Sequence, residues 1–182
     1  MARLPLTERS DIPEDLQYVW DRTAPGGEQL NIFRLLGNNA PLWRSYLRMG
    51  NGLWEQCGLD IQTRELVILR TAILHHSTYE WHQHVRIGRE AGLADDRIVA
   101  LHQWRASDKF SESERALLAY VDAVAASDHP SDEVHNTLAA HFDASTIVGV
   151  NLLTSFYAMT AKFLGAMEAE TEAPFVGWQL DG

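Results

Sequence analysis

The chain has 182 residues, of which 46% are hydrophobic and 22% charged, a composition typical of one globular domain with a proper core. Its formal net charge of −10 comes from 25 acidic and 15 basic side chains, and it argues against binding to nucleic acid or to anionic lipid. Its single cysteine, Cys57, excludes an internal disulfide, a redox-active cysteine pair and a cysteine-based zinc site.

We expect a cytoplasmic protein that does not enter a membrane. The first fifteen residues contain acidic side chains and lack the apolar core of a secretory signal. No run of about 18 uninterrupted apolar residues predicts a membrane span. The longest candidate, residues 147–164, is interrupted by Asn151, Thr154, Ser155, Thr160 and Lys162.

Apolar residues recur with helical spacing along nearly the whole chain, and no alternating β-branched run predicts a strand. The Ser111-Glu-Ser-Glu114 capping box, Ser131 and Asp143 mark helix starts, and Gly58 marks a helix end. Gly50 and Gly52 predict a bend in one helix. The expected helices span residues 14–20, 28–36, 41–57, 64–76, 78–91, 95–104, 112–126, 131–142 and 143–170.

This pattern predicts a single all-α domain over residues 1–182, with about eight or nine helices and its core at about 40–130. Residues 24–27, which read Ala-Pro-Gly-Gly, are expected to separate two helices. Residues 171–182 contain Pro174, Phe175 and Trp178 but no helical pattern. They are expected to form an arm that packs on a partner subunit, with a tail that lies on its own subunit or is disordered as the alternative.

The polar residues that could carry chemistry begin with Glu65. On a helix, Glu65 shares a face with the apolar residues Ile68 and Ala72, where a carboxylate is costly to bury unless it is paired. A buried carboxyl group of this kind could carry a proton. The alternative is a first-turn glutamate that is favourably placed near the helix N-terminus.

A second polar group lies in the segment HHSTYEWHQH at residues 75–84, which holds four of the eight histidines. Ser77, Glu80 and His84 share one helix face, so a hydroxyl, a carboxyl and an imidazole could meet there. Ser77-x-x-Glu80 is also a capping box, and an N-cap is the alternative role for Ser77. Glu65 and His84 would be roughly 28 Å apart on one straight helix. A turn at residues 75–78 would instead form two antiparallel helices and place Glu65 and His84 side by side.

We expect no bound metal and no cofactor. His82 and His84 point to nearly opposite sides of a helix, and the HExxH motif is absent. A metal held by His76, Glu80 and His84 is the alternative. The sequence also lacks a GxSxG motif, a phosphate-binding loop and a GxGxxG motif.

The segments Arg64-Glu-Leu-Val-Ile-Leu-Arg70, Tyr79-Glu-Trp81, His84 and Ala91-Gly-Leu93, with Ile98, resemble the carboxymuconolactone decarboxylase family, which includes AhpD-type alkylhydroperoxidases. The resemblance covers about residues 42–101 closely. The family motif is a glutamate, a CxxC pair that begins twelve positions later, and a histidine four positions after the second cysteine. Ser77 and Glu80 occupy the two cysteine positions here, so the resemblance does not imply reduction of peroxides by thiols.

The resemblance implies an AhpD-like all-α fold, a homo-oligomer (trimer, hexamer or dimer) and a site built on Glu65 and His84. Decarboxylases of this family take a small anionic lactone, release carbon dioxide and protonate a dienolate carbon. By this resemblance His84 is the acid, Glu65 orients it or relays the proton, and Glu80 and Ser77 complete the catalytic set. Arg70 or Arg86 would hold the substrate anion. The expected substrate-binding residues are Tyr79, Trp81, Arg70 and His76, with core packing or surface exposure as the alternatives.

Three functions follow as hypotheses. The first is a cofactor-free lyase for a small lactone or an enolisable acid. The second is a relative of the peroxidases that has lost thiol activity. The third is a non-enzymatic oligomeric protein that binds a hydrophobic ligand in the same pocket, which the six tryptophans would report by fluorescence.

Overall fold

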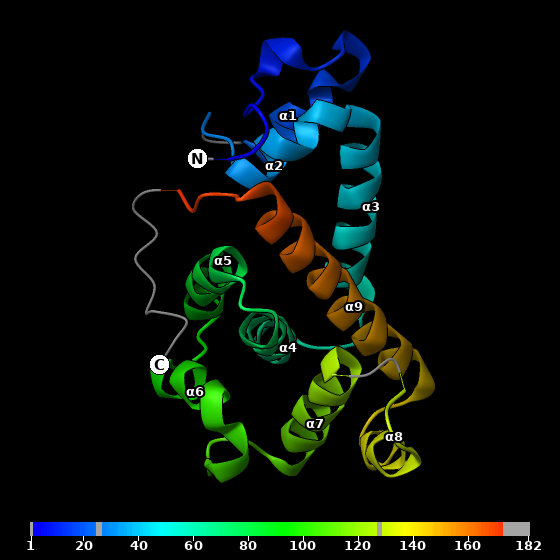
Figure 1. Ribbon diagram of the computed structural model, residues 1–182. Helices are drawn as coiled ribbons and strands as arrows, with labels where there is room; N and C mark the ends of the chain where they lie inside the picture. The colour runs from blue at the N-terminus through cyan, green and yellow to red at the C-terminus, as the bar shows by residue number, and fades with distance from the viewer. Residues whose placement is uncertain (1, 25–26, 127–128, 173–182) are drawn as a thin grey trace.

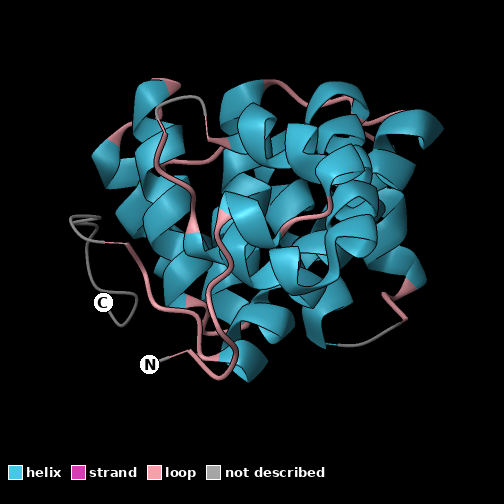
Figure 2. Cartoon of the chain, turned by 90° about the horizontal axis from the view of Figure 1, so that it is seen from above, coloured by secondary structure: helices cyan, strands magenta, loops and turns pink. Residues whose placement is uncertain are grey.

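The structure is a computed structural model that describes residues 2–24, 27–126 and 129–172 (Figure 1). Over these ranges its regular elements are helices, without strands, as the helical periodicity predicts (Figure 2). Short 3-10 helices, η1 (Arg9–Asp11), η2 (Glu14–Leu16), η3 (Gly37–Asn39) and η4 (Leu101–Ala106), link the longer elements. The α-helices are α1 (Gln17–Thr23), α2 (Asn31–Leu36), α3 (Ala40–Gln56), α4 (Ile61–Leu74), α5 (Thr78–Glu90), α6 (Asp95–Ala100), α7 (Glu112–Ala126), α8 (Asp132–Ala139) and α9 (Ala144–Met167).

Most predicted helices are present, and the differences in their bounds have local causes. The side chain of Asp60 accepts hydrogen bonds from the backbone N–H groups of Gln62 and Thr63, so α4 begins at Ile61 rather than at residue 64. Glu65 therefore lies in the second turn of α4, and its interpretation as a first-turn glutamate is wrong. α3 continues through both glycines that predicted a bend. The helix predicted over 95–104 divides into α6 and η4.

Helix α4 lies at the centre of the fold and is surrounded by α5, α7 and α9 (Figure 1). Val67 and Ile68 pack into an apolar cluster with α7 and α9, whereas Leu66 and Leu69 pack into a second cluster with α5, α6 and η4. All four side chains are fully buried. Each such side chain stabilises the folded state by about 1.5–3 kcal/mol. The apolar surface on nearly all sides of this helix therefore fixes its central position.

The start of α9 packs closely against the end of α3. A Cβ atom on Gly149 would lie 2.7 Å from the Cα atom of Cys57, so only glycine allows this approach. Gly58, directly after α3, has a φ angle of +81°, as expected for a glycine that ends a helix. Cys57 is 2% exposed at this junction. Its side chain is therefore part of the core.

Helix α9 is the longest described helix and is strongly apolar. Its length and composition would allow it to cross a membrane, contrary to the expectation from uninterrupted apolar runs. Half of its most apolar stretch is buried inside the fold, and the core helix of a soluble protein meets the same criteria. The absence of a membrane span stays a prediction.

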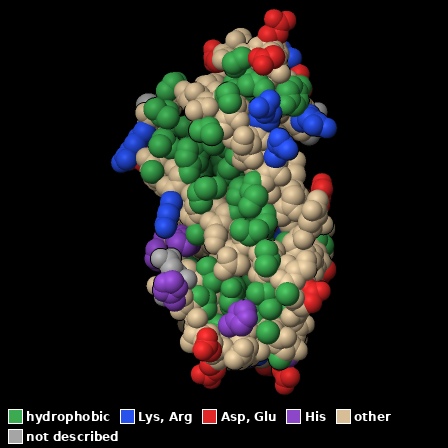
Figure 3. All heavy atoms as spheres, turned by 90° about the vertical axis from the view of Figure 1, so that its right-hand side faces the viewer, with side chains coloured by type: hydrophobic (Ala, Val, Ile, Leu, Met, Phe, Trp, Pro, Cys, Tyr) green, Lys and Arg blue, Asp and Glu red, His purple; other side chains and the backbone are tan. Residues whose placement is uncertain are grey.

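An apolar groove of about 520 Å³ lies between α3 and α9. Figure 3 shows apolar side chains gathered along this side of the molecule. Leu42, Met49, Leu152 and Met159 line the groove, and each is at least two-fifths exposed. The predicted homo-oligomer stays a prediction.

Of the predicted C-terminal arm, the structure describes Thr171 and Glu172. Residues 173–182, with Pro174, Phe175 and Trp178, lie outside the described residues, as do residues 25–26 of the predicted break after α1. Glu172 contacts its own chain at Tyr79 and Gln83. The start of the arm therefore packs on its own subunit.

Candidate functional site

The turn between α4 and α5 brings Glu65 and His84 together. His76 has a left-handed backbone conformation, with φ of +51°, and the chain reverses there. The Nδ1 atom of His84 donates a hydrogen bond to Oε2 of Glu65 at 2.6 Å, across 19 residues of sequence. Glu65 is fully buried and His84 is 5% exposed. The structure confirms the prediction that a turn between two antiparallel helices brings these two residues into contact.

A buried arginine holds the other oxygen of Glu65. The Nε and Nη2 atoms of Arg64 each donate to Oε1 at 3.2 Å. Arg64 is itself fixed, because its Nη1 donates to the backbone oxygen of Trp54 at 2.9 Å and its guanidinium stacks 4.3 Å from the Trp54 ring. Because Arg64 holds Glu65 in place, the hydrogen bond from His84 to Glu65 fixes the orientation of the imidazole ring. The Nε2 atom of His84 therefore points away from Glu65.

Glu80 faces that second imidazole nitrogen. Its Oε2 lies 3.5 Å from Nε2 of His84, and its side chain is buried. Burial raises the pKa of Glu80 to about 7; His84 opposes the rise and Glu65 adds to it. Glu80 can therefore gain and lose a proton near neutral pH.

The surroundings of His84 also change its pKa. Burial on its own lowers the pKa of His84, but the charge and hydrogen bond of Glu65 outweigh it, so the pKa is raised. Two aromatic rings pack edge-to-face with the imidazole, with centroids 5.0 Å away for Tyr157 and 6.0 Å away for Trp54. The buried carboxyl group of Glu80 and this imidazole can exchange protons with a molecule beside them.

A cavity of about 320 Å³ lies next to Glu80 and His84, within the size range of sites for small ligands. Tyr79, Glu80, Gln83 and His84 form its polar side on α5. Aromatic side chains from α3 and α9 form another part of its lining, called here the aromatic side. These are Tyr46, Trp54, Phe156 and Tyr157.

The tyrosines of the aromatic side are held in their neutral form. Burial is the main cause that raises the pKa of Tyr46 and of Tyr157, and nearby Glu80 adds to both effects. The Nε1 atom of Trp54 donates to the Tyr157 hydroxyl at 2.7 Å. The hydroxyls of Tyr46 and Thr160 share a hydrogen bond at 2.9 Å. Both rings are thereby fixed around the cavity.

Four residues predicted for the site lie outside this cavity wall. Ser77 is the N-cap of α5, since its hydroxyl accepts from the backbone N–H of Glu80. Arg70 pairs with Asp122 on α7 and also donates to the backbone oxygen of Leu101. Trp81 is buried in the apolar cluster around Leu66 and Leu69, and His76 is exposed at the turn.

Two other residues suggested by the sequence do line the cavity. Tyr79 contributes to its polar side, and Arg86 lies on the same helix one turn beyond His82. Of the four expected substrate-binding residues, only Tyr79 therefore lines the cavity. Of the two arginines suggested as anion holders, only Arg86 does.

The aromatic side was not predicted from the sequence. Tyr46 and Trp54 lie on α3, whereas Phe156 and Tyr157 lie on α9, far from them in the chain. Their helical spacing indicated apolar faces but not which faces meet. A motif of neighbouring residues could not identify this set, because its members lie on two helices that are far apart in the sequence.

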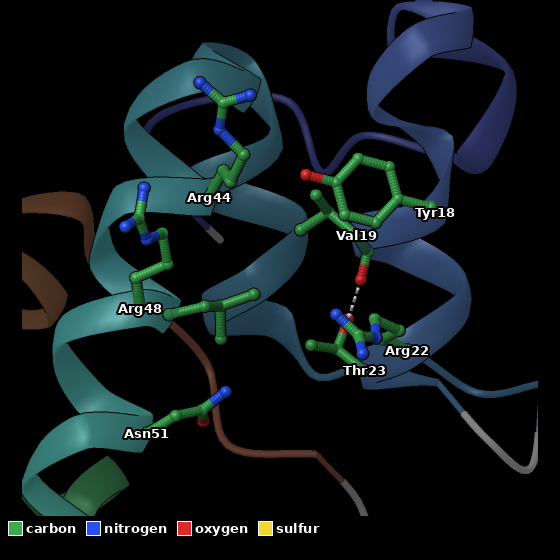
Figure 4. Close-up of a pocket in the computed structure, with 8 residues that line it drawn as sticks. Tyr18, Val19, Arg22, Thr23, Arg44, Arg48 and Asn51 are labelled. Carbon is green, nitrogen blue, oxygen red and sulfur yellow. Dashed lines mark hydrogen bonds between the residues drawn. The ribbon is translucent and has the colours of Figure 1, made fainter.

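A second hollow, of about 730 Å³, opens between α1 and α3 (Figure 4). Arg22 comes from α1, and Arg44 and Arg48 come from α3. Arg44 and Arg48 are four positions apart on one helix, an unfavourable spacing for like charges. Within the described part of the chain, none of the eight side chains that line the hollow is acidic. The hollow shares Thr23, Leu47 and Asn51 with the cavity beside His84.

The described residues contain no group of three or more histidine, cysteine, aspartate or glutamate side chains that could hold a metal ion. The fold and site define the class of protein: an all-α domain with a buried glutamate–histidine pair at a small, largely apolar cavity. Residues 41–123, which contain Glu65, Glu80 and His84, match the Carboxymuconolactone decarboxylase family. Over this segment, which is less than half of the chain, the sequence matches that family, and the resemblance predicted from the sequence is confirmed.

One sequence relative is itself uncharacterized. The uncharacterized protein YnjA of Escherichia coli (strain K12) is 34% identical over 76 residues, which are 41% of this chain and 42% of YnjA. The match thus spans less than half of that relative's length.

Comparison with solved structures supports the fold assignment. An uncharacterized peroxidase-related protein with an AhpD core from Ralstonia eutropha JMP134 is 19% identical, with a TM-score of 0.84 over 96% of this chain and 94% of that protein. The debrominase Bmp8, in a complex with 2,3,4-tribromopyrrole, is 18% identical, with a TM-score of 0.81 over 95% of each chain. The predicted AhpD-like all-α fold is confirmed.

Proposed function

We propose that this protein is a carboxymuconolactone decarboxylase-like enzyme, a cofactor-free lyase that acts on a small anionic lactone or enolisable acid. One observation carries the proposal: His84 lines the cavity while its Nδ1 is bound to Glu65, and Glu80 faces its Nε2. This arrangement places two proton-exchanging groups at the wall of a space that fits one small ring.

The proposed reaction needs one proton at carbon. The bond between the substrate and its carboxylate breaks, carbon dioxide leaves, and the electron pair stays on the substrate as an enolate conjugated with the lactone carbonyl. His84 or protonated Glu80 then gives one proton to the enolate carbon. Glu65 fixes the imidazole and stabilises its positive form. The aromatic side of the cavity excludes water and favours the dispersal of charge in the transition state.

The arginine-lined hollow supports an anionic substrate. Arg22, Arg44 and Arg48 are exposed at a space that adjoins the cavity, in a protein whose net charge is −10. A cleft lined by one sign of charge raises the local concentration of the opposite ion. Of the two arginines that the sequence suggested, Arg70 is paired with Asp122 and Arg86 with Glu90. We therefore assign the attraction of the anion to the hollow.

The first test is the absorbance of 4-carboxymuconolactone with purified wild-type protein and with His84→Ala. We expect the substrate to disappear with wild type and the rate to fall at least about 100-fold in the variant, because a positioned acid is lost. His135→Ala, at an exposed histidine on α8, is the matched control and should leave the rate unchanged. Equal rates for wild type and His84→Ala would refute the proposed mechanism.

The arginine hollow leads to a separate prediction. In Arg44→Glu, kcat/KM for the anionic lactone should fall by about tenfold at low salt, because steering of the substrate by charge is reduced. Added sodium chloride should shrink the difference, since salt screens exposed charges. Lys162→Glu, at an exposed residue of α9 away from the hollow, serves as the control for net charge. If the fall in kcat/KM did not depend on salt, electrostatic steering of the substrate by the hollow would be contradicted.

Two further observations bear on the alternatives. Cys57 is buried at the junction of α3 and α9, and the described lining of the cavity contains no cysteine, so a thiol peroxidase is not proposed. Bmp8, which shares the fold, binds a small ring compound, 2,3,4-tribromopyrrole, and this supports a ligand of similar size here. Quenching of Trp54 by a ligand without turnover would favour the non-enzymatic binding protein.

A further inference from the structure

Glu172 is bound beside the cavity by groups from two distant elements. It lies in the segment that follows α9. The Tyr79 hydroxyl donates to its Oε1 at 2.6 Å, and Nε2 of Gln83 donates to its Oε2 at 2.7 Å. The backbone N–H of Asn31 also donates to Oε1. Both oxygens of one carboxylate are therefore bound, by three converging donors.

Two of these donors are buried and belong to the wall of the cavity. Tyr79 is 4% exposed and Gln83 is 5% exposed, and both line the same space as His84. The Tyr79 hydroxyl is held in place because it also accepts a hydrogen bond from the backbone N–H of Ile32 at 3.2 Å. The donors are thus positioned by α5 and α2, which are independent of the segment that carries Glu172.

Gln83 has a further feature that points to a ligand. Its Oε1 atom is buried and has no hydrogen-bond partner among the described residues. A buried acceptor without a partner destabilises the folded state, because it has lost its hydrogen bonds to water. A ligand that brings a hydroxyl group next to its carboxylate would pair with this atom as well as with Nε2.

We propose that Tyr79, Gln83 and the backbone N–H of Asn31 form a carboxylate-binding site of the cavity, occupied here by Glu172 and open to a small ring or unsaturated carboxylic acid that displaces it. The inference rests on the proposed function, because it assigns the position of the substrate carboxylate. Three donors that converge on two oxygens match a carboxylate. Glu172 then acts as a tethered competitor.

The tether has a quantitative consequence. A group linked to the same chain has an effective concentration in the millimolar range, so a free carboxylate must exceed that concentration or add contacts of its own. The apolar side of the cavity, which includes Trp54 and Phe156, supplies such contacts for a ring. Removal of Glu172 should therefore strengthen binding of a ring carboxylate and leave a neutral ring of the same shape unaffected.

The test is a fluorescence titration of the whole chain with benzoate, followed by the tryptophans that include Trp54. We expect Glu172→Ala to bind benzoate about tenfold more tightly than wild type, since the competing carboxylate is gone. Thr171→Ala, at the neighbouring residue, should equal wild type. Tyr79→Phe in the Glu172→Ala background should lose about tenfold in benzoate affinity, because one hydrogen bond to a charged group is removed.

Two control ligands make the result specific. Benzamide has the same ring without the charge, and inorganic phosphate has charge without the planar carboxylate; neither should gain affinity in Glu172→Ala. An equal gain for benzamide would mean that the variant only enlarges the cavity, and unchanged benzoate binding would also overturn the proposal. Because these titrations need no turnover, an inactive protein that passes them would refute the lyase and leave the carboxylate site standing.

Discussion

Glu65→Gln is expected to lower the free energy of unfolding by about 3 kcal/mol, because it leaves the buried guanidinium of Arg64 without its carboxylate. This value is at the lower end of the range for breaking a buried ion pair. We expect the lower end because Arg64 keeps its hydrogen bond to Trp54 and its stacking contact with that ring. His84 also loses the charged acceptor that fixes its Nδ1. Turnover should therefore fall by at least about 100-fold in the fraction that is folded.

Urea unfolding at neutral pH measures the first effect, and the lactone assay at a temperature where the variant is folded measures the second. Glu90→Gln is the matched control. Glu90 pairs with Arg86 four residues away on the surface of α5, and such pairs contribute about 0.5 kcal/mol or less. If Glu65→Gln were no less stable than Glu90→Gln, the buried group of Arg64, Glu65 and His84 would not be the anchor of the site.

Glu80→Gln should change how stability depends on pH. Burial raises the pKa of Glu80 from its ordinary 4.5 to about 7. Between these values the folded protein retains a proton that the unfolded chain releases, so stability falls as pH rises through this window. The difference amounts to about 3 kcal/mol between pH 4.5 and pH 8. A glutamine cannot ionise, so the variant should lack this part of the loss.

His84 contributes in the same direction. Its pKa is raised by Glu65 against the opposing effect of burial, so the stability it supplies is full below its ordinary value of 6.5 and is lost as pH rises through the folded value. Wild type should thus be most stable in mildly acidic solution. Glu80→Gln should retain the His84 part of the pH dependence alone.

Unfolding in urea at several pH values between about 4.5 and 8 provides the measurement. Relative to wild type, Glu80→Gln should gain stability steadily toward pH 8. Glu133→Gln, which alters an exposed carboxyl group on α8, should follow the wild-type curve. Parallel curves for wild type and Glu80→Gln would show that Glu80 is ionised at neutral pH, and would remove it as a proton donor.

Local sequence patterns predict the helices and one half of the site. The helical period and the caps at Ser77 and Asp143 depend on neighbouring residues, so they can be recognised without the fold. The Glu65–His84 contact follows from the same local information. A short turn joins the two helices, and residues at about the same distance before and after that turn lie side by side. The apolar surface around α4 likewise predicts its burial.

Which distant faces meet at the cavity depends instead on the packing of the whole domain. Tyr157 reaches His84 from α9, Trp54 reaches it from α3, and Glu172 reaches Gln83 across 89 residues. The arginine hollow likewise needs α1 and α3 side by side. Apolar periodicity identifies a face that will be buried but not its partner, because hydrophobic attraction is non-directional. The partners are selected when all helices pack together and their shapes must fit, since an interior at close packing tolerates few mismatches.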